Sequence, residues 1–462
     1  MFFKTIKSAG LSQLSYILGD DDTGECIVID PRRDTNIYLQ IAAENDSRIT
    51  GIFETHLHAD FVSGSHQLRA DCGAPILGGA SDEVQFDYVP LNDGETFTIG
   101  DLTLTALHTP GHSPEHLSYL IEGGEGASKP WGLFTGDTLF AGSVGRPDLS
   151  AGVSSEDLAE RLHRSLFEKI LKLPDGIIVY PGHGSGSPCG GSIGDRDQTT
   201  IGYERLNNPK LQKTEVNDFK EAVAADLPDE PAYYKRLKAL NKKGAKVTGG
   251  IPALGALTAQ ELKNQMASAH ALVLDVREVT AFGGGHIPGA IHLALRLSFD
   301  SWAGRILPAD QPIYLVGEDL QDVQKAHRHL YRMGFDEVRG YLLGGMRTWI
   351  SSGQPLATLS LYSVNDLNER LQQAQNEMTL LDVRSKAEWQ QGHLPGATHL
   401  FAAELPEQLD SFDADKEIIT YCGSDFRASL GASLLKRKTG TDVGVLLGSM
   451  KAWKQSGLSL EE

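Results

Sequence analysis

Short apolar runs that stop at a polar residue recur along roughly the first 205 residues of the chain. They are rich in β-branched side chains, which is typical of strands, and span residues 14–18, 26–30, 51–54, 102–107, 132–135 and 177–180. Apolar positions at helical spacing lie between some of them, at 37–45 and 156–173. The pattern predicts a layered α/β domain whose polar residues gather at strand ends, where sites in such folds usually lie.

The rest of the chain repeats itself. Leu274–Arg277 recurs as Leu381–Arg384, and Gly285–Ala290 recurs as Gly392–Ala397, both at an offset of 107 residues. Each copy reads as strand, loop, strand and helix, which predicts a small α/β domain with a parallel sheet. A period near one hundred is too long for a solenoid and indicates tandem domains. We expect domains at 1–248, with a helical extension and linker from about residue 208, at 254–356 and at 357–462.

Length, charge and cysteine content narrow the classes of protein. The 462 residues suggest about three domains. The formal charge of −19 argues against a nucleic-acid binder, which needs a basic face, and against an anionic membrane surface. No apolar run approaches the eighteen or so residues that span a bilayer, and the N-terminus lacks the apolar core of a signal peptide. The four cysteines are too few and too scattered for a disulfide framework, so the role of each must be considered separately. We expect a cytoplasmic homo-oligomer.

Histidines and aspartates follow several of the predicted strands. Taken one at a time, such residues are often only polar loop residues. Together they offer the nitrogen and oxygen ligands that suit zinc, iron or manganese, and crowding them without a cation would carry a desolvation cost. The sequence therefore predicts a metal site built from some of His56, His58, Asp60, His108, His112, Asp137 and His183.

The motifs HxHxD, TPGH, GD and PGH, in this order across residues 14–190, resemble those of the metallo-β-lactamase superfamily. The resemblance implies an αββα sandwich. Hydrolases of this superfamily that hold two metals usually read HxHxDH, but Phe61 stands at the sixth position here. Because a benzyl ring cannot coordinate a metal, the second metal position would retain only Asp60, Asp137 and His183. We therefore expect one metal.

Within the superfamily, Gly136–Phe140 and Gly142–Asp148 are similar to a stretch of the persulfide dioxygenases. That resemblance implies one Fe(II) per chain, held by His56, His112 and Asp137. Two histidines and one carboxylate leave positions on the metal for a substrate sulfur and O₂. On this interpretation His58, Asp60 and His183 orient the ligands and bound water.

Two arginines and a cysteine are candidates for substrate contacts. Arg146 is expected to hold a substrate carboxylate, such as glutathione supplies, with a surface salt bridge as the alternative. Arg205, in a stretch that resembles a terminal motif of the same family, is a second candidate for that pocket. Cys189 lies in a Gly- and Ser-rich loop that we expect to be exposed, which makes it a candidate sulfur acceptor or regulatory thiol.

The second repeat carries a cysteine where the first has none. Cys422 ends an apolar run at 418–421, and the segment from Cys422 to Arg427 resembles the active-site loop of the rhodanese sulfurtransferases. The resemblance implies a persulfide on Cys422 and an anion-binding role for Arg427; the alternative is a small buried apolar residue. Aligning the two copies places Val316 at the position of Cys422 and Gln321 at that of Arg427. We expect the first copy to be a non-catalytic spacer or docking module.

Together these resemblances imply a persulfide dioxygenase coupled to a sulfurtransferase. A glutathione or coenzyme A persulfide would be oxidised by O₂ to sulfite and thiol, and sulfite would accept sulfur from Cys422 to give thiosulfate. Because both sites lie on one chain, the effective concentration of sulfite at the second site would be raised. The expected role is the detoxification of sulfide and persulfides. The alternatives are a thioester hydrolase of the glyoxalase II type and a non-enzymatic sulfur sensor or scaffold.

Overall fold

Side chains alternate in direction along the strand β2 (Gln13–Asp20), all of whose residues are buried. Leu14, Tyr16 and Leu18 pack into one apolar cluster, whereas Ile17 packs into another. Since successive residues of a strand point to opposite faces of the sheet, this strand is covered on both faces. The sheet is therefore an inner layer of the fold.

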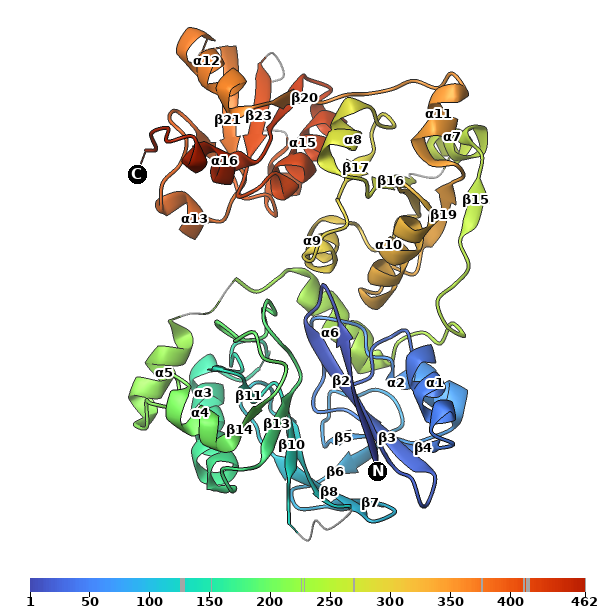
Figure 1. Cartoon of the computed structure of the whole chain (residues 1–462), viewed down its shortest axis with the longest axis vertical. Helices are drawn as coiled ribbons and strands as arrows, with labels where there is room; N and C mark the ends of the chain where they lie inside the picture. Colours follow the sequence, from blue (N-terminus) through green and yellow to red (C-terminus); the bar gives the residue numbers. More distant parts are fainter. Residues whose placement is uncertain are drawn as a thin grey trace. The chain divides into compact units, whose positions relative to one another are not determined.

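The structure is a computed structural model that describes residues 1–124, 129–150, 152–225, 227, 229–268, 271–374, 377–409, 412 and 416–461 (Figure 1). Its contacts divide the chain into two compact units. The first comprises Met1–Pro252 with Tyr331–Gly334, and the second comprises Ala253–Leu330 with Phe335–Glu462. None of the described helices is both long enough and apolar enough to cross a membrane.

The first unit contains two six-stranded sheets with the orders β1-β2-β3-β4-β5-β6 and β14-β13-β10-β9-β8-β7. Between them lies a core with Tyr16, Phe53 and Phe134. A short hairpin, β11 (Leu139–Phe140) and β12 (Ser143–Val144), follows β10. The other strands are β1 (Phe2–Ser8), β3 (Glu25–Ile29), β4 (Arg48–Phe53), β5 (Ile76–Gly79), β6 (Val89–Leu91), β7 (Thr96–Ile99), β8 (Leu102–His108), β9 (Leu117–Gly123), β10 (Gly132–Gly136), β13 (Ile178–Pro181) and β14 (Thr199–Thr200).

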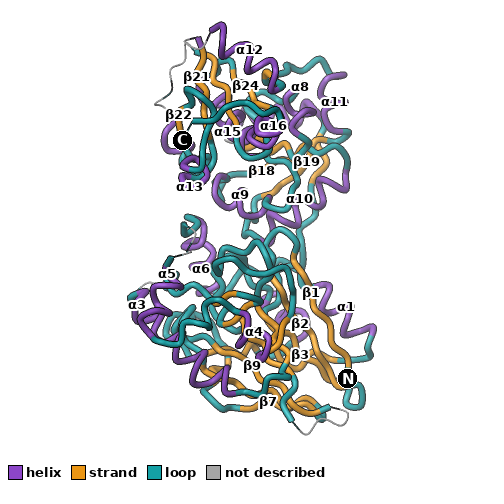
Figure 2. The backbone as a smooth tube through the Cα atoms, turned by 60° about the vertical axis from the view of Figure 1, so that its left-hand side comes forward, coloured by secondary structure: helices purple, strands orange, loops and turns teal. Residues whose placement is uncertain are grey.

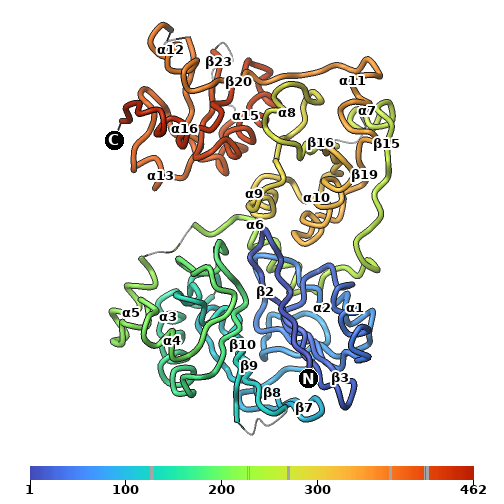
Figure 3. Tube along the Cα trace, in the orientation of Figure 1, coloured from blue at the N-terminus to red at the C-terminus, as the bar shows by residue number. Residues whose placement is uncertain are grey.

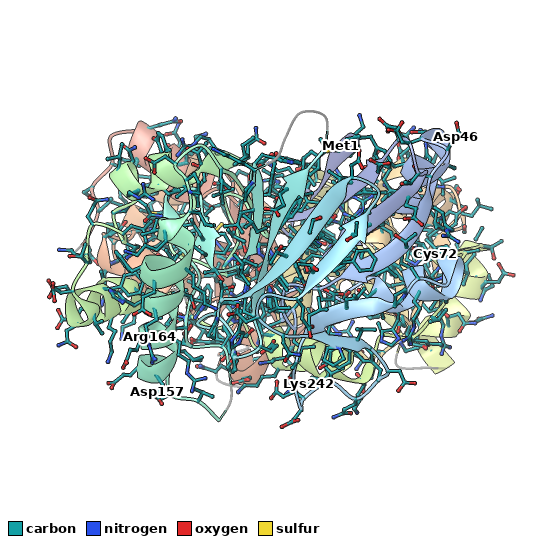
Figure 4. All side chains as sticks on the ribbon, turned by 90° about the horizontal axis from the view of Figure 1, so that it is seen from below. Met1, Asp46, Cys72, Asp157, Arg164 and Lys242 are labelled. Carbon is teal, nitrogen blue, oxygen red and sulfur yellow. The ribbon has the colours of Figure 1, made fainter. Side chains whose placement is uncertain are left out.

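Helices cover the outer faces of both sheets (Figure 2). On the first sheet lie α1 (Asn36–Glu44) and α2 (Ser65–Cys72), which share a core with β2. On the second lies α3 (Ser155–Arg164), continued by turns at Ser165–Lys169 and Ile170–Lys172. The Ser154 hydroxyl accepts a hydrogen bond from the Asp157 N–H and caps α3. Figure 4 labels Asp157 in the first turn of this helix and Arg164 at its last residue. The αββα sandwich implied by the sequence motifs is confirmed.

Three more helices complete the first unit: α4 (Ile201–Asn207), α5 (Val216–Ala224) and α6 (Tyr233–Lys243). The last two lie in the stretch for which the sequence predicts a helical extension, and Figure 3 shows the chain path through them. Phe219 and Val223 of α5 pack into the core beneath α3, while Tyr234 and Leu237 of α6 are buried.

The second unit contains two five-stranded sheets of the same order, β15-β19-β18-β16-β17 and β20-β24-β23-β21-β22, and all their strand pairs are parallel. The predicted pair of parallel α/β domains is confirmed. The strands are β15 (Gly255–Leu257), β16 (Leu272–Asp275), β17 (Ile291–His292), β18 (Ile313–Val316), β19 (Val338–Leu342), β20 (Ser360–Tyr362), β21 (Met378–Asp382), β22 (Thr398–His399), β23 (Glu417–Tyr421) and β24 (Val443–Leu446). The helices are α7 (Ala259–Ser268), α8 (Val279–Gly284), α9 (Phe299–Ile306), α10 (Leu320–Arg332), α11 (Gly345–Ser351), α12 (Val364–Ala374), α13 (Lys386–Gln390), α14 (Leu405–Gln408), α15 (Phe426–Thr439) and α16 (Ser449–Gln455).

Strand register corrects the alignment of the two copies by one residue. In the first copy Asp275 lies opposite Val316, and in the second the matching Asp382 lies opposite Tyr421. Val316 is therefore equivalent to Tyr421, and the residue equivalent to Cys422 is Gly317. The assignments of Val316 to the position of Cys422 and of Gln321 to that of Arg427 were both wrong, since the same shift places Asp322 at the position of Arg427. The first copy still has neither the thiol nor the arginine there.

Candidate metal and thiol sites

Three of the predicted ligands converge in the first unit. Each follows a strand: His56 comes after β4, His112 after β8 and Asp137 after β10. One ligand atom from each lies within 4.8 Å of the others, and all three residues are buried. Asp137 Oδ2 is 3.9 Å from His56 Nε2 and 3.6 Å from His112 Nε2. The site forms because strands of both sheets end at the same place.

The second nitrogen of each imidazole is held by a hydrogen bond. The Nδ1 of His112 donates to the backbone oxygen of Arg146 at 3.0 Å. The Thr55 hydroxyl donates to Asp30 Oδ2 at 2.8 Å, so its oxygen is left to accept from the Nδ1 of His56 at 2.9 Å. Both Nε2 atoms are thus lone-pair donors directed at the carboxylate. Hydrogen bonds of this kind fix the tautomer of metal-binding histidines.

The electrostatics of the cluster fit a cation. Asp137 Oδ2 is buried and has no hydrogen-bond partner among the described residues, which is costly for a carboxylate. Burial lowers the pKa values of His56 and His112, so both imidazoles are neutral near pH 7. Burial alone would raise the pKa of Asp137, but His183 holds it below its usual range. Neutral imidazoles and an ionised carboxylate are the forms that bind a metal.

The second histidine of the HxHxD motif lies outside the cluster. His58 packs against the ring of His56 at a centroid distance of 4.3 Å, but its Nε2 lies 3.2 Å from Asp30 Oδ1 and 3.0 Å from Glu54 Oε2. Burial would lower the pKa of His58, yet the two carboxylates raise it well above its usual value. The buried Phe61 ring packs on His58 at 4.4 Å.

Asp60 and His183 form a chain that ends on the metal cluster. His183 Nδ1 lies 2.8 Å from Asp137 Oδ1, and its Nε2 lies 2.7 Å from Asp60 Oδ2. Burial would lower the pKa of His183, but the two carboxylates outweigh it and raise this pKa to about 10. His183 therefore holds the ligand Asp137 from the side away from the histidine pair.

The two predicted substrate arginines are engaged within the protein. The buried Arg146 side chain makes a bidentate pair with Asp148, with both distances 2.7 Å, and its Nη1 donates to the backbone oxygen of Pro188. Arg205 pairs with Asp175 and donates to the backbone oxygen of Leu171 at 2.5 Å. A substrate carboxylate would have to compete with these partners.

The neighbour of Arg205 has a structural role that the motif resemblance did not assign. Glu204 is buried, and its carboxylate accepts hydrogen bonds from the Gly142 N–H at 2.8 Å and from the Asn208 amide at 2.9 Å. Asn208 in turn donates to the backbone oxygen of Ser143. These bonds fix the β11–β12 hairpin that follows the ligand Asp137.

Cys189 is buried, with 2% of its surface exposed, so the exposure expected from its Gly- and Ser-rich loop was wrong. The loop folds inward because its backbone pairs with the hairpin, through Arg146 N–H and Cys189 O at 3.1 Å. Its Sγ lies 3.6 Å from the Tyr234 hydroxyl and within 4.8 Å of ligand atoms of Asp60 and His183. Burial raises the pKa of this thiol well above its ordinary value.

In the second unit Cys422 sits between β23 and α15, as the sequence predicts. Its Sγ accepts a hydrogen bond from the Asp425 N–H at 3.2 Å, and its own N–H donates to Ser449 Oγ at 3.1 Å. Asp425 has a φ of 103°, a conformation that side chains rarely adopt, and it turns the loop toward the sulfur. Arg427, at the start of α15, makes a bidentate pair with Glu388 at 2.5 and 2.7 Å.

Glu388 is a site residue that sequence reasoning missed. Arg427 holds its pKa down at about 2 against the opposing effect of burial. A comparison of the two copies at the offset of 107 residues could have found it. Glu388 of the copy that carries the cysteine is replaced by Ala281 in the copy that lacks the cysteine. The first copy has therefore lost the carboxylate together with the thiol.

The first copy contacts the cysteine loop of the second. Arg296 donates to Asp425 Oδ1 at 2.9 Å and to Glu278 Oε2 at 2.9 Å. His292 on β17 bonds through Nδ1 to Ser429 Oγ of α15 at 2.9 Å. The first copy is therefore in contact with the cysteine loop, and its expected role as a spacer or docking module stays a prediction.

Comparison with known proteins agrees with this architecture. The model of the metallo-beta-lactamase superfamily matches residues 9–183, and that of the rhodanese-like domain matches residues 258–352 and 363–456. The chain is 32% identical over 203 residues to a mitochondrial persulfide dioxygenase of Bos taurus, covering 43% of this chain and 70% of that one. It is also 32% identical over 171 residues to a cytoplasmic hydroxyacylglutathione hydrolase of Arabidopsis thaliana.

Coverage differs among these relatives. The match to the Arabidopsis hydrolase covers 37% of this chain and spans only 62% of that protein's length. A solved structure of a metallo-beta-lactamase from Staphylococcus aureus is 35% identical, covers 74% of this chain and 99% of that one, and superposes with a TM-score of 0.67. The chain belongs to the metallo-β-lactamase superfamily, as a fusion of a metallo-β-lactamase domain with two rhodanese-like domains.

Proposed function

We propose that the chain is a non-haem Fe(II) persulfide dioxygenase coupled to a sulfurtransferase. It converts a persulfide RSSH, O₂ and water into the thiol RSH, sulfite and two protons. The observation that carries the proposal is the cluster of His56, His112 and Asp137, since two imidazoles and one carboxylate form the facial ligand set of non-haem iron oxygenases. The 32% identity to a persulfide dioxygenase supports it.

The surroundings of the cluster favour one metal over two. Phe61 offers no ligand atom, and His58 Nε2 lies between the carboxylates of Asp30 and Glu54. His183 and Asp60 are hydrogen-bonded to each other at 2.7 Å. A hydrolytic centre with two metals would have to break this bond to free Asp60 and His183 as ligands.

The residues of the cluster would hold Fe(II) in a defined orientation. His56 and His112 present Nε2, because Thr55 and the backbone oxygen of Arg146 accept from their Nδ1 atoms. Bound there, Fe(II) supplies the redox chemistry between O₂ and a thiol-borne sulfur. His183 keeps the carboxylate of Asp137 in place through its 2.8 Å hydrogen bond.

Sulfur transfer is assigned to Cys422. Its thiolate attacks the outer sulfur of RSSH, a new S–S bond forms on Cys422, and RSH leaves with the proton. Sulfite then attacks the outer sulfur of this persulfide, so thiosulfate departs and the Cys422 thiolate is regenerated. The Asp425 N–H at 3.2 Å from Sγ stabilises negative charge on the sulfur.

We assign the domains to 1–248, 254–356 and 357–462, with the first rhodanese-like domain non-catalytic. The proposed partners are a persulfide of glutathione, coenzyme A or a similar thiol, together with O₂, sulfite and thiosulfate. We place this sulfide-detoxifying enzyme in the cytoplasm as a homo-oligomer that binds neither nucleic acid nor membrane.

The rival is a metal-dependent thioester hydrolase, favoured by the 32% identity to hydroxyacylglutathione hydrolase. Metal analysis and two activity assays on the same preparation separate the two functions. We expect one iron per chain, O₂ uptake with glutathione or coenzyme A persulfide, and no hydrolysis of S-lactoylglutathione. Two zinc ions per chain with thioester hydrolysis and no O₂ uptake would overturn the proposal.

A further inference from the structure

A cavity of about 330 Å³ lies in the first unit. At about 30 Å³ for each water, it has room for on the order of ten water molecules. Its walls are Ala59, the segment 148–150, Glu230 and one face of α6. Ala59 lies in the HxHxD motif, between His58 and Asp60.

Two contacts connect this cavity to the metal cluster. The Tyr234 side chain lines the cavity, and its hydroxyl lies 3.6 Å from Cys189 Sγ, which itself is near Asp60 and His183. Asp148 also lines the cavity and is clamped by Arg146, whose backbone oxygen accepts from His112. The lining residue Asp148 is thus linked through Arg146 to the proposed ligand His112, and Tyr234 is linked through Cys189 to His183, which holds the ligand Asp137.

The cavity has a cationic wall in a chain of net charge −19. Lys235, Lys238 and Lys242 line it from α6, and spacings of three and four residues place them on one face of that helix. Lys238 and Lys242 share Glu83 at 3.7 and 2.9 Å, with side chains 14% and 26% exposed. Lys235 makes no ion pair with any residue that the structure describes.

The acidic groups of the lining do not cancel this charge. Asp148 is neutralised by its bidentate pair with Arg146, which leaves Glu230 as the acidic residue of the lining without such a pair in the described part of the chain. The three lysines thus have two carboxylates near them: Glu83, which pairs with both Lys238 and Lys242, and Glu230 in the lining. The positive charge of the lysines therefore exceeds the negative charge of these carboxylates.

A buried hydroxyl also lacks a partner here. Ser150 lines the cavity, is 9% exposed, and its Oγ makes no hydrogen bond to any described residue. A buried hydroxyl without a partner is unfavourable unless a ligand or water satisfies it. The cavity therefore offers cationic donors along one wall and a hydroxyl on another, which suits an anionic ligand with amide groups.

We infer that this cavity binds the anionic end of the thiol that carries the persulfide, with Lys235 as its main cationic contact. The inference rests on the proposed function. The shared chemistry is a flexible thiol bearing amides and a carboxylate or phosphate, which both glutathione and coenzyme A supply. It gives α6 the anion-binding role that the sequence predicted for Arg146, whose guanidinium is bound to Asp148.

The first test measures O₂ uptake by the iron-loaded full-length chain with glutathione persulfide, coenzyme A persulfide and the uncharged persulfide of 2-mercaptoethanol. For Lys235→Ala we expect the KM for a charged persulfide, relative to that for the uncharged one, to rise about tenfold. The charged persulfide that responds more strongly identifies the carrier. Lys243→Ala is the matched control, because Lys243 lies on α6 outside the cavity lining.

Equal KM ratios for the wild type, Lys235→Ala and Lys243→Ala would overturn the inference. A second measurement separates its failure from that of the proposed function: titration calorimetry with reduced glutathione and coenzyme A. Binding that weakens about tenfold in Lys235→Ala supports the cavity even if no persulfide is oxidised. Binding equal to that of the wild type overturns the inference even if the dioxygenase is active. Ser150→Ala should weaken binding in the same assay.

Discussion

The backbone of Gly145 passes close to the proposed metal ligands Asp137 and His112. The methyl group of an alanine at this position should therefore displace the ligands and prevent metal binding. A Cβ at this position would lie 1.8 Å from the backbone oxygen of Asp137 and 3.2 Å from the Cβ of His112. Real Cβ contacts are essentially never under 3.0 Å, so the backbones of residue 145 and of Asp137 must separate by about 1.2 Å. Metal–ligand distances tolerate only about 0.2 Å, and changes to residues that support a metal ligand cost roughly 10- to 100-fold in metal affinity.

We therefore expect Gly145→Ala to lower metal affinity about 100-fold or more, equivalent to about 2.7 kcal/mol. Iron content after dialysis and O₂ uptake with a persulfide measure the loss. Gly142→Ala is the control in the same hairpin, since a Cβ there meets nothing within 4 Å and its φ of 75° costs only roughly 1–2 kcal/mol of stability. Gly182→Ala, with a Cβ 2.6 Å from Asp137 Oδ1, disturbs the same carboxylate independently.

Circular dichroism and sulfur transfer by Cys422 report whether a variant is folded. If folded Gly145→Ala and Gly182→Ala keep wild-type iron content and O₂ uptake, the assignment of Asp137 as a ligand is wrong. Equal loss of iron in Gly142→Ala would show that any change in the hairpin has the same effect, which also contradicts the reasoning.

Three further predictions concern the second unit. Cys422→Ser should keep O₂ uptake but release sulfite in place of thiosulfate; unchanged thiosulfate production would contradict the assigned nucleophile. Arg296→Gln removes the contact with Asp425 at 2.9 Å and should slow sulfur transfer several-fold without altering O₂ uptake, whereas wild-type transfer would refute the docking role. The pKa of Glu388 is lowered from 4.5 to about 2 by Arg427, so their pairing stabilises the unit above about pH 4.5 and is lost as the pH falls toward 2. Urea unfolding should show a smaller loss of stability between pH 5 and 3 for Glu388→Gln than for the wild type; equal losses would refute this coupling.

Strand ends were the part of the site that could be predicted. His56, His112 and Asp137 each follow an apolar run that forms a strand. The two stacked sheets bring the ends of these strands together at one edge of the sandwich. The position of Cys422 could be predicted for the same reason, because a strand and a helix flank it directly in the sequence. The layered α/β domain and the two parallel sheets likewise follow from short-range patterns and the internal repeat, whereas the αββα sandwich was implied by the resemblance of the motifs to the metallo-β-lactamase superfamily.

Contacts between distant segments could not be predicted. The burial of Cys189 depends on backbone pairing of its loop with the hairpin near Arg146, which no local composition reveals. Arg146 differs, because its pairing with Asp148 is local and a salt bridge was the stated alternative to substrate binding; only the burial of its side chain could not be predicted. The one-residue error at Val316 arose because apolar strands of similar composition align equally well at neighbouring registers, and only hydrogen-bond register distinguishes them.

Oxygen consumption by the Cys422→Ser chain loaded with one Fe(II) tests the central claim most directly, because sulfite then accumulates as the final product. With glutathione or coenzyme A persulfide in a sealed oxygen electrode, the account predicts one O₂ consumed and one sulfite released for each persulfide. No O₂ uptake above that of the Gly145→Ala chain with either persulfide would contradict it.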